Sequence, residues 1–195
     1  MTRWMRCFLL LGMAVASPGH ADNTTGSVEE LLKSGRCVRC NLTGADLQQA
    51  ALKSAMLQGS ILDQANLTGA NLSAARLFKA KMRQTNASRA NLQQALLRVA
   101  DMSGIVLRGA DLQRADLSQA NLEGADLQDA DLRKATFEGA FLKNARLVGA
   151  DLRETVFFGA NLDGVDWSGA QLSGTYWFNG KRCREGSVGQ CDLGP

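Results

Sequence analysis

The chain has 195 residues, of which 28 are Leu and 27 are Ala, whereas Val and Ile together number only 11. This length suits one domain, and an apolar content of 45% is too high for a disordered chain. Few β-branched residues argue against an ordinary β-sandwich or barrel, and the net charge of +3 is too small to favour a polyanionic partner.

Residues 1–21 have the features of a secretory signal peptide. Arg3 and Arg6 form a short basic region, and an apolar stretch follows at residues 7–16. Small residues then occupy the two positions that a signal peptidase reads, which predicts cleavage after Ala21. We therefore expect a periplasmic or secreted protein. An uncleaved membrane anchor is the alternative, but the stretch is shorter than the ~18 residues that span a bilayer, so no stable span is expected after cleavage.

Cleavage would change the charge and the chemistry of the mature chain. It removes His20, the only histidine, and leaves 20 basic and 19 acidic residues. Such a nearly neutral chain predicts neither a nucleic-acid binder nor a polyanion mimic, and it has no imidazole for acid–base catalysis.

Residues 22–39 form an N-terminal segment in which we expect a short capping helix. Ser27 and Glu30 have the spacing of a capping box, with Ser27 as the N-cap. Val28, Leu31 and Leu32 are then expected on one side of a helix that ends before Gly35. This side would cover the end of the repeat region that follows.

Residues 40–178 repeat every five residues. Steps of five from Leu42 to Trp177 give 28 central positions, and 21 of these centres are Leu. The residue two before the centre is Ala in 21 of the 28 units. The residue between this position and the centre is most often Asp or Asn. On an α-helix, a period of five would place the Leu side chains on all sides of the helix. On a straight strand, it would place successive Leu side chains on opposite faces. A one-sided core forms if the chain turns a corner in every unit, which predicts a solenoid whose coils are hydrogen-bonded about 4.8 Å apart.

This A(D/N)LXX pattern resembles the pentapeptide-repeat family over residues 40–177. The resemblance implies an all-β fold, a right-handed quadrilateral β-helix with four units per coil and about seven coils. Centres twenty residues apart, such as Phe137, Phe157 and Trp177, would then stack. So would the outward carboxylates of Asp111, Asp131 and Asp151, whose repulsion we expect to be offset by neighbouring basic residues, namely Arg114, Arg133, Lys134 and Arg153.

One position predicts a void in this interior. Ala87 stands where most units have Leu, and Ile105 takes an inward position usually held by Ala in the next coil. We expect Ile105 to fill part of the space that Ala87 leaves.

The four cysteines that remain after cleavage predict two disulfides, because their number is even and the protein is exported. Cys37 and Cys40 lie at one end of the inferred solenoid, and Cys183 and Cys191 lie at the other end, roughly 30 Å away. A disulfide cannot span this distance, so the expected pairs are Cys37–Cys40 and Cys183–Cys191. The same distance argues against a single four-cysteine zinc site. A structural Cys37–Cys40 bridge is preferred over a thiol–disulfide redox motif, because no βαβ unit surrounds it.

The C-terminal end is expected to be closed by bulky side chains and an irregular disulfide loop or tail at 179–195. The side chains expected to give this cover are Trp167, Tyr176, Trp177 and Phe178.

One side of the solenoid carries unusual outward residues. We call it the apolar side, and its inward centres are Leu57, Leu77, Leu97, Leu117, Phe137, Phe157 and Trp177. Its outward apolar residues are Met56, Phe78, Leu96, Val99, Val156, Phe158, Tyr176 and Phe178. A contiguous apolar strip predicts a surface for a protein partner or for a second copy, unless one of the chain's own termini covers it.

The sequence thus favours a non-enzymatic, exported structural or protein-interaction scaffold, with no cofactor, no metal site and no nucleic-acid partner. One alternative, implied by the family, is a DNA mimic that binds a topoisomerase and confers antibiotic resistance; the nearly neutral mature charge and the export signal oppose it. The other is a periplasmic thiol–disulfide oxidoreductase that uses Cys37 and Cys40.

Overall fold

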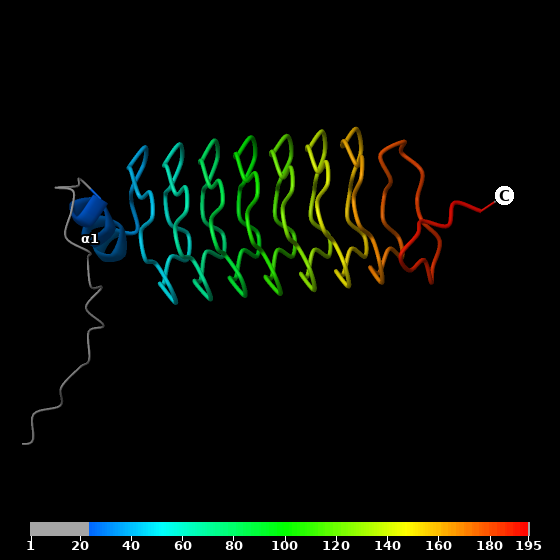
Figure 1. Cartoon of the computed structure of the whole chain (residues 1–195), viewed down its shortest axis with the longest axis horizontal. Helices are drawn as coiled ribbons and strands as arrows, with labels where there is room; N and C mark the ends of the chain where they lie inside the picture. The colour runs from blue at the N-terminus through cyan, green and yellow to red at the C-terminus, as the bar shows by residue number, and fades with distance from the viewer. Residues whose placement is uncertain (1–23, 195) are drawn as a thin grey trace, which may run out of the picture.

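The computed structural model of the protein describes residues 24–194. The expected signal peptide and its cleavage site lie outside the described residues. In Figure 1 regular coils stack along one axis, with helix α1 (Thr24–Ser34) at one end and the C-terminal segment at the other. Within residues 24–194 no helix is both long enough and apolar enough to cross a membrane.

Consecutive coils are joined by parallel bridges between residues that are twenty apart. These bridges run from Arg36–Met56 to Val156–Tyr176 and recur at every fifth residue, so four units make one coil with four sides. Each bridge is a single isolated pair, and no longer strand occurs in the described part of the chain. The all-β prediction therefore holds as a ladder of single bridges and not as continuous strands.

The centres and the small residues fill one continuous interior. From Leu42 to Leu152 every centre is at most 1% exposed. Phe137 and Phe157 stack with ring centroids 5.1 Å apart, and Phe157 meets Trp177 edge-on at 6.1 Å. Where a hydroxyl replaces the small Ala, it donates to a buried carbonyl: Thr85 Oγ1 lies 2.6 Å from the Leu62 oxygen. The inward polar residue is thus hydrogen-bonded, as a dry core requires.

The turn between units explains the preference for Asp and Asn. The Leu42 carbonyl accepts from the Ala45 N–H at 3.0 Å, and Gly44 within this turn has a φ of 65°. Asn41 Oδ1 accepts from the Thr43 N–H at 3.1 Å. All fifteen Asp or Asn residues that precede a centre make this same bond, which satisfies an amide that the coil ladder leaves free.

Helix α1 covers the N-terminal end of the core, but two details of the prediction are wrong. The helix ends before Gly35, as expected, with Gly35 at a φ of 69°. Ser27 lies inside the helix and is not its N-cap, because the helix already includes Thr24. Leu31 is fully buried and Val28 partly, whereas Leu32 is 54% exposed. Leu32 lies about 100° around the helix from Leu31, outside the narrow arc that faces the core.

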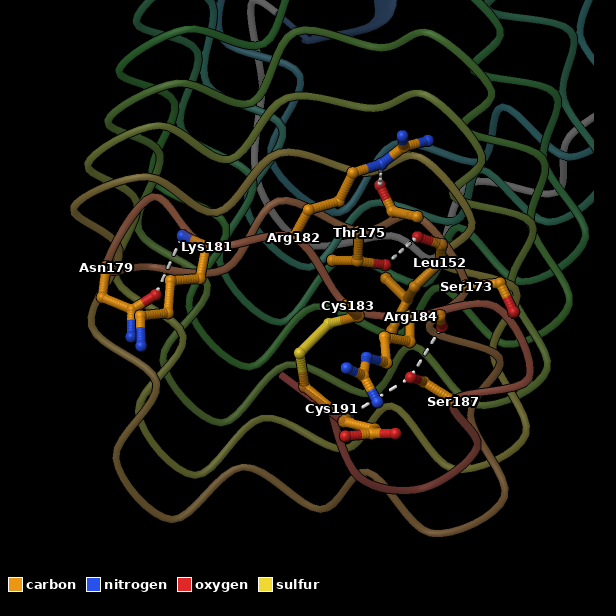
Figure 2. Close-up of a disulfide and its surroundings, with 12 residues drawn as sticks. Leu152, Ser173, Thr175, Asn179, Lys181, Arg182, Cys183, Arg184, Ser187 and Cys191 are labelled. Carbon is orange, nitrogen blue, oxygen red and sulfur yellow. Dashed lines mark hydrogen bonds between the residues drawn. A yellow bond between two sulfur atoms is a disulfide. The ribbon is translucent and has the colours of Figure 1, made fainter. Parts of the chain in front are cut away.

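At the other end the tail folds back onto the last coil. Antiparallel bridges join Gln171 to Val188 and Tyr176 to Arg182. The Leu172 N–H donates to the Ser187 carbonyl at 2.8 Å, so the tail takes the place of a further coil on this side. Figure 2 shows the Cys183–Cys191 disulfide that closes the tail.

The bulky side chains at this end divide into two groups. Trp167 and Trp177 pack against the core with ring centroids 5.1 Å apart, as expected for a cover. Tyr176 and Phe178 are 44% and 47% exposed, so their prediction as cover is wrong. They occupy outward positions on either side of the Trp177 centre, and only the centre points inward.

The space beside Ala87 gives a first testable prediction. Asn86 and Val106 are bridged, which places Ala87 and Ile105 in adjacent coils, and both are fully buried. If Ile105 fills the missing Leu volume, Ile105→Ala should lower the free energy of unfolding by ~1–3 kcal/mol more than Ala110→Gly.

The matching test is a double-mutant cycle measured by urea unfolding. Ala87→Leu should overpack the native core but be tolerated, or even stabilising, in the Ile105→Ala background. Additive effects of the two substitutions would mean that Ile105 does not occupy that space.

Candidate interaction surface

The structure places the predicted outward residues on one side of the coil stack, the apolar side. Bridges align one column along this side: Arg36, Met56, Arg76, Leu96, Asp116, Thr136, Val156 and Tyr176. The residues just after the centres form a second column beside it. Among the aromatic residues, Phe78 is 42% and Phe158 is 55% exposed, whereas Met56 and Val156 are half-buried. The tail comes close to the Phe158 ring at Gly180, but more than half of the Phe158 side chain stays exposed.

These residues do not form one continuous strip. Asp116, Ser118, Thr136 and Glu138 lie between two groups. We define the N-terminal patch as Val38, Met56, Phe78, Leu96 and Val99, and the C-terminal patch as Val156, Phe158, Tyr176 and Phe178.

The structure adds Val38, 47% exposed, to the predicted set. The bridged units begin at Arg36, which makes Cys37 a centre and Val38 an outward residue. One further step of five back from Leu42 in the sequence would have found it.

Basic side chains surround the N-terminal patch. They are Arg36, Arg39, Arg76, Lys79 and Arg98, all exposed. No acidic residue occupies an outward position on this side before Asp116. Arg98 lies 3.9 Å from Asp116, and the other four form no ion pair with the described residues. Lys79 Nζ lies 5.2 Å from the centre of the Phe78 ring. This half of the side is therefore both apolar and positively charged.

The apolar side departs from the local rules that stabilise the other three. An Asp or Asn precedes the centre in one of its eight units, against fourteen of twenty-one elsewhere, so most of its turns lack the side-chain hydrogen bond. Val99 has a φ of 59°, and it is the one β-branched residue among the non-glycine residues with positive φ in the described chain. Residues kept at a cost to stability are typical of functional surfaces.

Two substitutions on this side should stabilise the fold. Leu96→Asn supplies the missing turn acceptor, and Val99→Gly relieves the positive φ, so each should raise the free energy of unfolding by ~1 kcal/mol. Urea unfolding measures both. Gln119→Gly, at the corresponding position one coil later with a φ of 58°, is the control and should give a smaller gain. A loss of stability in either variant would contradict the argument.

One column of carboxylates on a polar side is paired with neighbouring arginines. Asp111, Asp131 and Asp151 are bridged in one column, as predicted. Arg133 lies 2.6 Å from Asp131 and 3.6 Å from Asp151, and Arg153 lies 2.5 Å from Asp151. Partial burial alone would raise the pKa of Asp151, but the hydrogen bonds and positive charge of Arg153, with the charge of Arg133, outweigh it and lower the pKa.

Two of the four basic residues predicted to offset this column do not pair with it. Lys134 pairs instead with Glu154 at 3.6 Å, and Arg114 forms no ion pair within residues 24–194. Both lie at the corner of the coil, whereas Arg133 and Arg153 lie on the flat side next to the carboxylates.

Both predicted disulfides are present. Cys37 and Cys40 have Cα atoms 5.3 Å apart, and Cys183 and Cys191 have theirs 5.1 Å apart. Cys37 is only 2% exposed because it is a centre. A redox motif needs an accessible sulfur, so this burial favours the structural role. No group of three potential metal-binding side chains occurs among residues 24–194.

Each coil has four sides, and each side is one five-residue unit. A stack of such coils is a repeat solenoid of the β-helix type. Pentapeptide repeats match residues 36–73, 75–114, 100–139, 110–149 and 150–176, in eight copies. The chain therefore belongs to the pentapeptide-repeat family, whose members are generally non-catalytic. A comparison with curated proteins finds no match.

Several solved structures are similar to this chain. The pentapeptide-repeat protein Rfr23 from the cyanobacterium Cyanothece 51142 is 27% identical, with 78% of this chain and 98% of that chain covered and a TM-score of 0.41. HetL from Nostoc sp. strain PCC 7120, involved in heterocyst differentiation regulation, is 30% identical over 75% of this chain and 89% of its own, with a TM-score of 0.29. The plasmid-mediated fluoroquinolone resistance protein QnrB1 is 19% identical over 75% and 78%, with a TM-score of 0.46.

Proposed function

We propose that this protein is an exported, non-enzymatic scaffold, a right-handed β-helix of about seven coils that binds a partner through its apolar side. The observation that carries this proposal is the departure of nearly all units of one side from a rule that two thirds of the units on the other three sides follow. Exposed aromatic residues and missing turn acceptors coincide there, and stability alone would select against both.

The two alternative functions receive less support. A DNA mimic needs an unpaired acidic surface, but the carboxylate column at Asp131 and Asp151 is paired with arginines. An oxidoreductase needs an accessible attacking thiol, but Cys37 is buried and Cys40 is partly buried.

The scaffold function can be tested by photo-crosslinking in cells. The photoreactive amino acid p-benzoylphenylalanine is placed at Phe158 in the C-terminal patch or, as a matched control, at Phe141 on another side. The two positions are alike, at 55% and 54% exposed. We expect a discrete crosslinked product from Phe158 and none from Phe141. Equal products from both positions, or none from either, would contradict the proposal.

Export is tested separately by cell fractionation and intact-mass analysis. We expect a mature chain that starts at Asp22, in the periplasm or medium, with two disulfides. An unprocessed chain that stays in the cytoplasm would rule out this part of the proposal and reopen the alternative of a topoisomerase-binding protein.

A further inference from the structure

We infer that the N-terminal patch and its basic rim bind the surface of an anionic phospholipid bilayer. The inference deepens the proposed function and rests on the apolar side being a binding side. In this inference the basic half of the apolar side binds lipid, and the C-terminal patch binds the protein partner that crosslinking at Phe158 tests.

The first support is the combination of side chains. Val38, Phe78 and Leu96 are 47%, 42% and 45% exposed, and the surrounding Arg and Lys residues place their charges at the same face. A lipid interface offers both phosphates for the cations and an apolar layer for the other side chains. Nucleic-acid phosphates would satisfy the cations but leave the aliphatic side chains without a partner.

The second support is the shortage of competing acidic groups. Arg36, Arg39, Arg76 and Lys79 have no ion-pair partner among residues 24–194, and the first outward acidic residue of this side, Asp116, lies next to Arg98. On the polar sides Arg83, Arg133 and Arg153 are paired, although Arg89, Arg114 and Lys143 have no ion pair with the described residues either; the apolar side differs in that none of its outward positions before Asp116 is acidic. Basic groups that are free of internal partners retain their full attraction for an anionic surface.

The third support is the shape of the backbone on this side. The Arg76 N–H donates to the Ala55 carbonyl at 2.8 Å, and the Arg76 carbonyl accepts from the Leu57 N–H at 2.9 Å. With the backbone groups used between coils, an acidic peptide cannot add as a further strand. The side chains instead form a patch about 15 Å long, from the Arg36 row to the Leu96 row, that suits a broad surface.

The test is co-sedimentation of the full chain, purified after processing in cells, with phospholipid vesicles. One set contains phosphatidylglycerol and phosphatidylcholine in equal parts, and the other contains phosphatidylcholine alone. We expect binding to the anionic vesicles, weakened by salt, and little binding to the neutral ones. The double variant Arg76→Gln/Lys79→Gln should bind about 30-fold more weakly.

Matched variants make the result specific to this patch. Arg89→Gln/Lys143→Gln removes the same charge from two other sides and should bind like the unmodified protein. Phe78→Ser should weaken binding severalfold, whereas Phe141→Ser on another side should not. Val99→Gly should bind more weakly while its stability rises, a combination that misfolding cannot produce.

Four outcomes would overturn the inference. They are no binding to anionic vesicles, equal binding to neutral vesicles, equal loss in the two double-charge variants, and a dimer in solution that Arg76→Gln/Lys79→Gln dissociates. The last would assign the patch to a second copy of the chain. A crosslink from Phe158 that persists in any of these cases would leave the proposed function standing.

Discussion

Phe157→Ala is expected to lower the free energy of unfolding by about 3–5 kcal/mol and to loosen the C-terminal coils. Phe157 is fully buried, and its ring contacts Phe137 at 5.1 Å, Trp167 at 5.6 Å and Trp177 at 6.1 Å between centroids. In a solenoid each coil is stabilised mainly by its neighbours, so the damage should be greatest near the substitution. Urea unfolding followed by tryptophan fluorescence measures it, since Trp167 and Trp177 are the tryptophans of residues 24–194.

The adjacent residue provides the control. Phe158 has the same side chain but points outward and is 55% exposed, so Phe158→Ala should change stability by no more than about 0.5 kcal/mol. Similar losses for the two variants would contradict the inward and outward assignment of neighbouring residues.

Loss of the C-terminal disulfide is expected to release the tail and lower stability by about 2–3 kcal/mol. Cys183→Ala/Cys191→Ala opens a loop of sequence separation 8, which increases the entropy of the unfolded tail. The Leu172 and Gly174 amides, which donate to Ser187 and Cys183, would then face solvent. Hydrogen exchange should show faster exchange at these two amides, and the uncovered edge should promote end-to-end association.

The disulfide at the other end separates this local effect from a general one. Cys37→Ala/Cys40→Ala should leave exchange at Leu172 and Gly174 unchanged. If these amides stay protected without the Cys183–Cys191 bond, hydrogen bonds and packing against the last coil hold the tail in place, and the disulfide is not needed for this.

The interior of this fold could be predicted from the sequence because burial imposes a strict register. A slip at any Leu centre would expose it, so the five-residue period fixed which residues point inward, and the Phe137–Phe157 stack followed. Both cysteine pairs followed from the distance between the two ends.

The parts that could not be predicted lack such a periodic constraint. Nothing in the tail sequence indicates that Gln171 pairs with Val188, because one antiparallel bridge leaves no pattern. The sequence predicted the wrong start for α1, because the Ser27–Glu30 spacing of a capping box does not prevent the helix from beginning earlier, at Thr24. The sequence contains Asp116 and Glu138, which separate the two patches. Their position between the patches is recognised only when the outward residues of this side are aligned coil by coil.

The twenty-residue bridge interval also limits how this chain can change in length. Removal of residues 101–120, one complete coil, leaves every later residue on its original side and brings the two patches closer together. Removal of any single five-residue unit keeps the Leu register but rotates everything after it by a quarter turn, so that the C-terminal patch would face a different direction from the N-terminal patch. The angular alignment of the two patches is therefore preserved only by insertions and deletions of whole coils.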